Sequence, residues 1–279
     1  MTTHFMDTVG ARIHYEVRGG GFPVVLIHAG IVNMGMWDDQ MVALAQDYRP
    51  IRYDIRGWGK SVEQNVGYSN HGDLRTLLAY LEVEEAVLVG ASYGGSIAID
   101  LALEHPELVK ALVLVGSGLG GYEFTNQGFE QELEASRRTY SDGNKALSAE
   151  YSARIWFDGQ GRARESVSMT SRDRALEMIL HTLDLPDEGG DAHELEPQAI
   201  DRLDEIEQPL LIILGEYDQQ DIFNISWLVR STVPQAELLT IDDAAHLPNM
   251  EKPDEFNRIV LDFLEAQLDR KSTRLNSSH

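Results

Sequence analysis

The chain contains no cysteine among its 279 residues. This absence excludes disulfide bonds, a thiolate nucleophile and any metal site that depends on thiolate ligands. It does not distinguish an oxidising from a reducing compartment, because a chain without thiols is compatible with both.

Basic residues are scarce as well, with 23 Lys and Arg against 46 Asp and Glu and a formal net charge of -23. Nucleic acids and anionic membrane surfaces repel such a chain, so we expect neither as a partner. No apolar run approaches the ~18 residues of a membrane span, and the first residues lack the basic and apolar regions of a signal peptide. We therefore expect a cytoplasmic protein, as a monomer or a homodimer.

Short runs rich in Val, Ile and Leu recur along the chain and alternate with helical patterns. The expected strands are residues 3–9, 11–17, 24–29, 49–54, 86–89, 111–115, 210–214 and 237–241, and the clearest expected helices are 73–81, 96–104 and 254–268. This alternation predicts an α/β fold with a mostly parallel, eight-stranded, twisted sheet and helices on both faces. Functional residues are then expected at the carboxyl ends of the strands.

The alternation stops in residues 122–207, which are polar and mostly helical in pattern, and it resumes at Gln208 and Pro209. We interpret residues 122–207 as a helical lid inserted into a core of residues 1–121 and 208–268. Residues 269–279 differ abruptly from the acidic helix before them and match the translation of a widely used sequencing-adapter oligonucleotide. We expect this tail to be an artefact of the reading frame rather than a basic interaction arm.

The segment Gly90-Ala91-Ser92-Tyr93-Gly94 joins an expected buried strand to an expected helix. A serine on such a tight turn is held in a strained conformation that exposes its hydroxyl, and the glycines on either side keep the turn free of clashes. The helix begins just after Ser92, so its free N–H groups and positive dipole end face charge that develops on a bound carbonyl oxygen. This context predicts that Ser92 is a nucleophile.

A serine hydroxyl needs a base to take its proton, and the base works best when a carboxylate orients it. Asp218 and His246 both follow expected strands, in Gly215-Glu216-Tyr217-Asp218 and in Ala244-Ala245-His246-Leu247-Pro248. The carboxyl ends of parallel strands share one edge, so these side chains are placed to meet Ser92.

Other residues compete for these roles and better suit structural ones. Asp221 lies at an expected helix start and suits an N-cap. Asp54 and Arg56 suit an ion pair or a loop brace, and His28 suits a brace for the loop that follows it. The histidines that compete with His246 are His28, His71 and His105.

The order of Ser92, Asp218 and His246, together with the fold pattern, resembles the α/β-hydrolase superfamily over about residues 5–268. The segments that carry the resemblance are Gly90–Gly94, Gly215–Asp218, Ala245–Pro253, Ile27-His28-Ala29-Gly30, in which Ala29 stands where glycine is usual, and Arg52–Ser61.

The resemblance implies that Ser92 is the nucleophile, that His246 is the general base and then acid, and that Asp218 orients His246. It also implies that the backbone N–H of Tyr93 is one oxyanion donor and that Gly30 or Ile31 supplies the second. Four large apolar side chains are expected to line a substrate pocket, namely Trp37, Phe124, Trp156 and Met250.

Relatives that open epoxides or displace halide carry aspartate at the position of Ser92, so a serine favours attack on an acyl carbon. We expect a small carboxylic ester or lactone, cleaved through an acyl-serine intermediate. The alternatives are a carbon–carbon bond hydrolase of a ring-cleavage diketone, a cofactor-free perhydrolase or haloperoxidase, and a non-catalytic ligand receptor on the same fold.

We expect no cofactor and no metal, because the sequence has neither a metal-ligand cluster nor a phosphate-binding loop. The glycines in residues 116–121 contain a Gly-x-Gly pattern, but no helical pattern with an acidic partner follows it, so we do not interpret them as a dinucleotide site.

Overall fold

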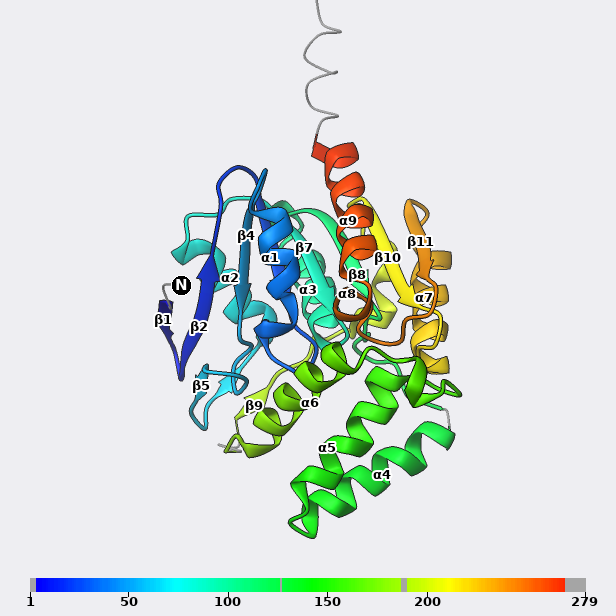
Figure 1. The fold of residues 1–279 in the computed structure, drawn as a ribbon. Coiled ribbons are helices and arrows are strands. Elements are labelled where there is room, and N and C mark those ends of the chain that lie inside the picture. The colour runs from blue at the N-terminus through cyan, green and yellow to red at the C-terminus, as the bar shows by residue number, and fades with distance from the viewer. Residues whose placement is uncertain (1–3, 126, 187–189, 269–279) are drawn as a thin grey trace, which may run out of the picture.

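The computed structural model describes residues 4–125, 127–186 and 190–268, so the expected tail at 269–279 lies outside the described residues. A nine-stranded sheet forms the centre of the molecule (Figure 1). Eight of its strands follow one path, in the order β1 His4–Thr8, β2 Ala11–Val17, β4 Arg49–Tyr53, β3 Pro23–Ile27, β7 Ala86–Ala91, β8 Val109–Val115, β10 Leu210–Gly215 and β11 Ala236–Ile241. The ninth, β5 Val62–Glu63, pairs with β2. These eight strands match the expected ones to within a few residues.

The six strands from β4 to β11 along this path are parallel to one another. Strand β2 runs antiparallel to both of its neighbours, β1 and β4. Parallel pairing brings the carboxyl ends of β3, β7, β8, β10 and β11 to one edge of the sheet. That shared edge is the expected position of the site.

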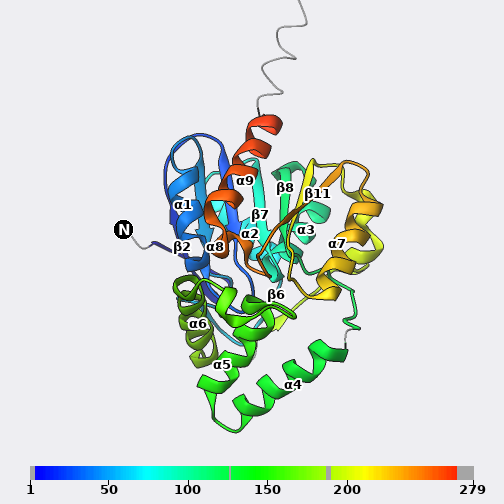
Figure 2. The same cartoon turned by 45° about the vertical axis from the view of Figure 1, so that its right-hand side comes forward.

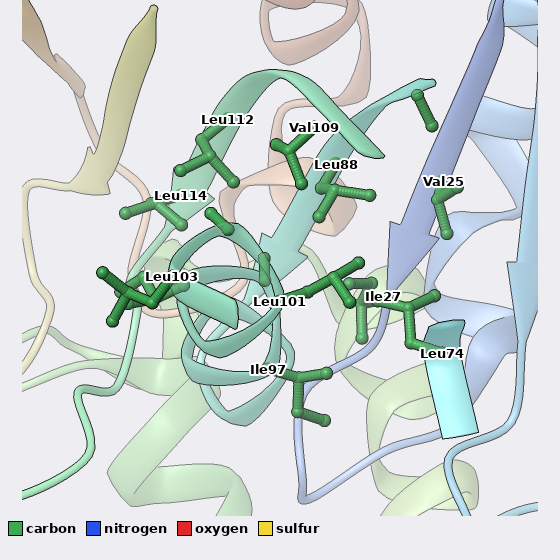
Figure 3. Packing of buried hydrophobic residues seen from close by; sticks show 14 of the residues in the cluster. Val25, Ile27, Leu74, Leu88, Ile97, Leu101, Leu103, Val109, Leu112 and Leu114 are labelled. Atoms are coloured by element: carbon green, nitrogen blue, oxygen red, sulfur yellow. The ribbon is translucent and has the colours of Figure 1, made fainter. Parts of the chain in front are cut away.

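Helices cover both faces of the sheet, as the sequence predicted. Alternate residues of β3 point to opposite faces and belong to different core clusters. On one face, Val25 and Ile27 pack with residues of α2 Asn70–Tyr80 and α3 Tyr93–Glu104 (Figure 3). Helix α7 Gln220–Thr232 contributes to the same cluster. Val24 and Leu26 pack on the opposite face with α1 Asp38–Leu44 and α9 Pro253–Leu268. A strand buried on both faces reads as a continuous apolar run, which is why these strands were visible in the sequence.

Between β8 and β10 the chain leaves the main sheet and forms α4 Gln127–Ser141, α5 Lys145–Ala153 and α6 Met169–Asp184. Both views place these three helices beyond one end of the sheet (Figures 1 and 2). We call residues 122–207 the insertion. It is not helical throughout, because β9 Asp191–Ala192 pairs with β6 Gly67–Tyr68 in a separate small sheet.

Helix starts were predicted less well than strands. Helix α2 begins at Asn70 rather than Asp73, and α3 begins at Tyr93 rather than Ser96. Asp221 was expected to cap a helix, and this prediction is wrong, because α7 begins at Gln220 and Asp221 lies inside its first turn. Its carboxylate instead accepts hydrogen bonds from the backbone and hydroxyl of Thr125, at 3.0 and 3.1 Å. In the described part of the chain, no helix is both long and apolar enough to span a bilayer.

A small cavity of about 100 Å³ lies between α3, the start of α2 and the returning end of the insertion. Its lining includes Asp100 on α3 and Glu194 on the insertion. Burial, followed by the nearby charges of Glu194 and Glu104, raises the pKa of the Asp100 carboxyl to about 7. The folded protein therefore retains a proton on Asp100 over a pH range in which the unfolded chain has lost it.

This proton makes stability depend on pH in a predictable direction. Between about pH 4 and pH 7 the native state binds more protons at Asp100 than the unfolded state does. The contribution of Asp100 to the free energy of unfolding therefore falls as pH rises. We expect Asp100→Asn to remove this loss. The difference in unfolding free energy between the variant and the wild type, measured by urea denaturation, should grow over that range in favour of the variant and level off above pH 7.

The matched control is Ser96→Ala, a change in the same cavity that removes no titrating group. Its effect on stability should be the same at every pH. A pH-independent effect of Asp100→Asn would contradict the prediction.

Candidate active site

Ser92 lies on the turn between β7 and α3 in a backbone conformation that is rare for a residue with a side chain, with φ 51° and ψ -115°. The turn is fixed on both sides of the residue. The Ser92 N–H donates to the carbonyl of Val115 at the end of β8 at 2.9 Å, and the Ser92 carbonyl accepts from Gly118 N–H at 2.9 Å. The strain is therefore maintained by bonds to the end of β8 and to the loop that follows it.

Glycine is required at two positions of this turn for lack of space. A Cβ atom on Gly90 would collide with the carbonyl oxygen of Gly94, and one on Gly94 would collide with the carbonyl oxygen of Ile27. The glycines that the sequence placed around Ser92 thus allow the strand, the turn and the helix to approach one another closely.

Asp218 and His246 form a buried pair on the loops after β10 and β11. The His246 Nδ1 atom lies 2.9 and 3.0 Å from the two carboxylate oxygens of Asp218. The side chain of His246 is 2% exposed and that of Asp218 is 0% exposed. Gln219 N–H also donates to Asp218 Oδ1 at 2.7 Å. Hydrogen bonding of Nδ1 to a carboxylate fixes the tautomer and orients the other ring nitrogen, Nε2, as an acceptor.

The segment after β8 brings Ser92 and this pair together. Val115 accepts the Ser92 N–H, and the next residue, Gly116, lies against the pair. A Cβ on Gly116 would lie 2.9 Å from Asp218 Oδ2 and 3.0 Å from His246 Nδ1, so a side chain here would displace the pair. The glycines of residues 116–121 do not form the pattern of a dinucleotide site, and the packing role of Gly116 was not predicted from the sequence.

The loop after β3 lies beside the first residue of α3. A turn closed by a 3.2 Å bond from Val32 N–H to the Ala29 carbonyl places Gly30 and Ile31 at its centre. A Cβ on Gly30 would lie 3.4 Å from the Cβ of Tyr93, so the two backbones are close neighbours. The N–H of Tyr93 is at the N-terminus of α3, where backbone donors have no partner within the helix.

His28 is fully buried and joins two loops. Ile55 N–H donates to its Nε2 at 2.9 Å, so Nδ1 carries the proton and donates to the Ala29 carbonyl at 2.8 Å. Burial lowers the pKa of His28, which keeps the imidazole neutral. Both ring nitrogens are occupied, as expected for a brace and not for a base.

The other competing residues are also in structural positions. Asp54 accepts from Met34 N–H at 3.0 Å and Lys60 N–H at 2.9 Å, and Arg56 forms a two-bond ion pair with Asp73. His71 lies in the first turn of α2, and His105 follows the far end of the 12-residue helix α3, about 18 Å along its axis from Ser92.

The insertion is attached to the loops that carry Asp218 and His246. Ile155 supplies a carbonyl to Gln219 Nε2 at 2.7 Å, and Trp156 supplies one to His246 N–H at 3.2 Å. The Trp156 ring packs against the His246 imidazole with centroids 4.5 Å apart. These contacts come from a π-helical turn at Arg154–Asp158, a type of turn that is often found at functional sites.

Two of the four expected pocket residues are in the core instead. Trp37 has no exposed surface and packs against Phe256, with ring centroids 6.1 Å apart, and Met250 is 1% exposed in the same cluster. The prediction that they line a pocket is therefore wrong, because both side chains are buried in the core cluster that includes residues of α1 and α9. Trp156 lies against the His246 ring, whereas Phe124 is 38% exposed and packs edge-on against Tyr122.

Among the described residues, no three His, Asp or Glu side chains converge in a way that would hold a metal ion. The polar groups that the ends of β7, β10 and β11 bring to this edge include the Ser92 hydroxyl, the Asp218–His246 pair and the backbone N–H groups at the start of α3. These groups together can support a nucleophile, a proton acceptor and anion-stabilising donors.

Comparisons with known proteins agree with this architecture. The family described as alpha/beta hydrolase fold matches residues 23–253. The chain is 31% identical to a 2-hydroxy-6-oxononadienedioate/2-hydroxy-6-oxononatrienedioate hydrolase of Burkholderia vietnamiensis, over 92% of each chain.

Two solved structures are also similar. One is Est816, described as an N-acyl homoserine lactone degrading enzyme, with a TM-score of 0.70 and 28% identity over 93% of this chain and 100% of the other. The second is a bromoperoxidase from Bacillus anthracis, with a TM-score of 0.76 and 25% identity over 95% of this chain and 100% of the other. The protein belongs to the α/β-hydrolase family.

Proposed function

We propose that this α/β hydrolase cleaves a small, uncharged carboxylic ester or lactone through an acyl intermediate on Ser92. The observation that carries the proposal is the strained Ser92 turn beside a buried Asp218–His246 pair, with the Val115–Gly116 segment touching both. A strained serine, an oriented imidazole and free backbone N–H groups are the parts that acyl transfer requires.

In the proposed first step, Ser92 Oγ attacks the acyl carbon while His246 Nε2 takes the hydroxyl proton. Asp218 holds the Nδ1 side of the ring and stabilises its positive charge. Collapse of the tetrahedral intermediate breaks the bond to the alcohol, which leaves with the proton from His246. A water molecule, deprotonated in turn by His246, then releases the acid and restores Ser92.

The negative oxygen of each tetrahedral intermediate is proposed to bind the N–H groups of Tyr93 and of Gly30 or Ile31. These donors belong to a helix N-terminus and a closed turn, so they are oriented before substrate binds. The insertion acts as a lid over this site. The contacts of Trp156 with the His246 backbone and ring support that role. Because Trp156 belongs to the insertion, movement of the lid would also affect the position of the His246 imidazole.

The ion pairs of the arginines support an uncharged substrate. Within the described residues, the arginines with buried side chains are each paired with at least one carboxylate. In the insertion, Arg172 binds Asp158 and Glu150, and Arg162 binds Glu251 and Asp243. Cations already neutralised in this way are poor partners for a substrate carboxylate, and the overall charge of -23 repels anions.

The second candidate function is hydrolysis of a carbon–carbon bond next to a ketone, with the same three residues. The similarity to the hydrolase of B. vietnamiensis supports it, because that protein is named for a dienedioate substrate. Such a substrate carries two carboxylates. The paired arginines described above favour the uncharged ester or lactone over this alternative.

The role of Ser92 is tested by Ser92→Ala. We expect kcat for p-nitrophenyl acetate to fall by about 10⁴-fold or more, because no other group supplies the acyl acceptor. The control is Ser226→Ala, which removes another buried serine hydroxyl on α7, 2% exposed, and should leave kcat unchanged. Wild-type turnover by a correctly folded Ser92→Ala variant would contradict the proposal.

The preference for uncharged substrates is tested with two esters of equal acyl length. We expect kcat/KM for methyl p-nitrophenyl succinate to exceed that for mono-p-nitrophenyl succinate by about tenfold or more at low salt, because the charged ester is repelled. The ratio should shrink as ionic strength rises. Equal or faster cleavage of the charged ester would contradict the assignment and favour the dianionic substrates of the second candidate.

A further inference from the structure

In the proposed oxyanion turn, residues 29–32, side chains fix the first two of the three peptide groups. The carbonyl of Ala29 accepts from His28 Nδ1 at 2.8 Å, and the carbonyl of Gly30 accepts from Trp58 Nε1 at 2.6 Å. The second bond joins residues 28 positions apart in the sequence. It adds to the backbone bond from Val32 N–H that closes the turn.

Each of these bonds determines where the next N–H points. A trans peptide group is planar, with its C=O and N–H on opposite sides. The carbonyl of Ala29 belongs to the same peptide as the N–H of Gly30, so His28 fixes the direction of that donor. In the same way, the carbonyl of Gly30 shares a peptide with the N–H of Ile31, which Trp58 therefore fixes.

Trp58 is itself held firmly. Its backbone N–H donates to the Ile55 carbonyl at 2.9 Å, and the following Gly59, with φ +56°, packs so closely on Asp54 that a Cβ would collide with the carboxylate. Asp54 in turn accepts from the backbone of Lys60 at 2.9 Å. The indole N–H is thus presented from a braced loop.

The same indole also contacts the residue that supplies the other proposed donor. The Trp58 ring packs against the Tyr93 ring with centroids 5.7 Å apart, and Asn70 Nδ2 donates to the Tyr93 hydroxyl at 2.6 Å. Trp58 therefore touches both elements of the proposed oxyanion site, the turn at Gly30 and the start of α3.

We propose that Trp58 is a positioning residue for the oxyanion site. Its indole N–H holds the Gly30 carbonyl away from the substrate and so keeps the Ile31 N–H facing the reacting oxygen, beside the Gly30 N–H whose direction His28 fixes. This inference rests on the proposed function of Ser92. Without the indole N–H the Gly30–Ile31 peptide is free to rotate, and a rotated peptide presents its negative carbonyl oxygen where the oxyanion forms.

The test is Trp58→Phe, which keeps an aromatic ring against Tyr93 and removes the N–H. Donors to the oxyanion act mainly in the transition state, so kcat for p-nitrophenyl acetate should fall by about tenfold or more while KM changes by less than about twofold. The affinity for a trifluoromethyl ketone, which forms a tetrahedral adduct with the serine, should fall by the same factor as kcat/KM. Trp58→Tyr provides a second variant if Trp58→Phe does not fold.

The matched control is Trp227→Phe, a change at a side chain that is 59% exposed on α7, and it should alter none of these values. Unchanged kcat and ketone affinity in Trp58→Phe would overturn the inference. So would equal losses in kcat and in substrate binding with a lowered melting temperature, the result expected of a packing role alone. Ser92→Ala, assayed in parallel, distinguishes failure of the proposed function from failure of the role of Trp58. If Ser92→Ala is active, both proposals are wrong. If Ser92→Ala is inactive while Trp58→Phe keeps full activity, only the role of Trp58 is wrong.

Discussion

The backbone turn at Ser92 is the constraint on which the rest of the site depends. A residue with a side chain is held at φ 51°, and the structure maintains that conformation by placing hydrogen bonds on both sides of it. The close approach of β7, α3 and β3 leaves no room for side chains at Gly90 and Gly94. Ser92 is therefore held in this strained conformation immediately before α3, whose first N–H groups have no partner within the helix.

The other proposed groups lie at the same edge because parallel strands end there. Asp218 and His246 follow β10 and β11, and the turn at Gly30 follows β3. Contacts from outside the sheet add precision: the insertion binds the His246 loop through Trp156, and the loop after β4 binds the Gly30 turn through Trp58. The sheet thus brings the strand ends together, and we propose that these braces orient the groups that follow them.

The sequence was sufficient for the fold and for the placement of Ser92, Asp218 and His246 at one edge, because each depends on local pattern. Strands buried on both faces are continuous apolar runs, and a serine between two glycines, directly after such a strand, is typical of an exposed nucleophile. The sequence was a poor guide to side chains whose surroundings come from distant segments. Trp37 and Met250 are apolar and close to the site in sequence, but both are buried in the core, and apolarity alone does not distinguish a core from a pocket.

Trp58 and Gly116 were missed for a related reason. Each acts by approaching a residue far away in the chain, Gly30 in one case and the Asp218–His246 pair in the other. The available signals were indirect, since Trp58 lies between two glycines and Gly116 follows directly on an apolar strand. Asp221 was misassigned because its partner, Thr125, lies 96 residues earlier.

The central claim is that the Ser92 hydroxyl, the Asp218–His246 pair and the backbone donors of two loops act on one acyl group. The most direct measurement is a crystal structure of the protein after reaction with a small fluorophosphonate, which mimics the tetrahedral intermediate. We expect phosphorus bonded to Ser92 Oγ and the phosphoryl oxygen about 3 Å from the backbone nitrogens of Tyr93 and of Gly30 or Ile31. Phosphorus on another residue, or a phosphoryl oxygen that meets no backbone N–H, would contradict it.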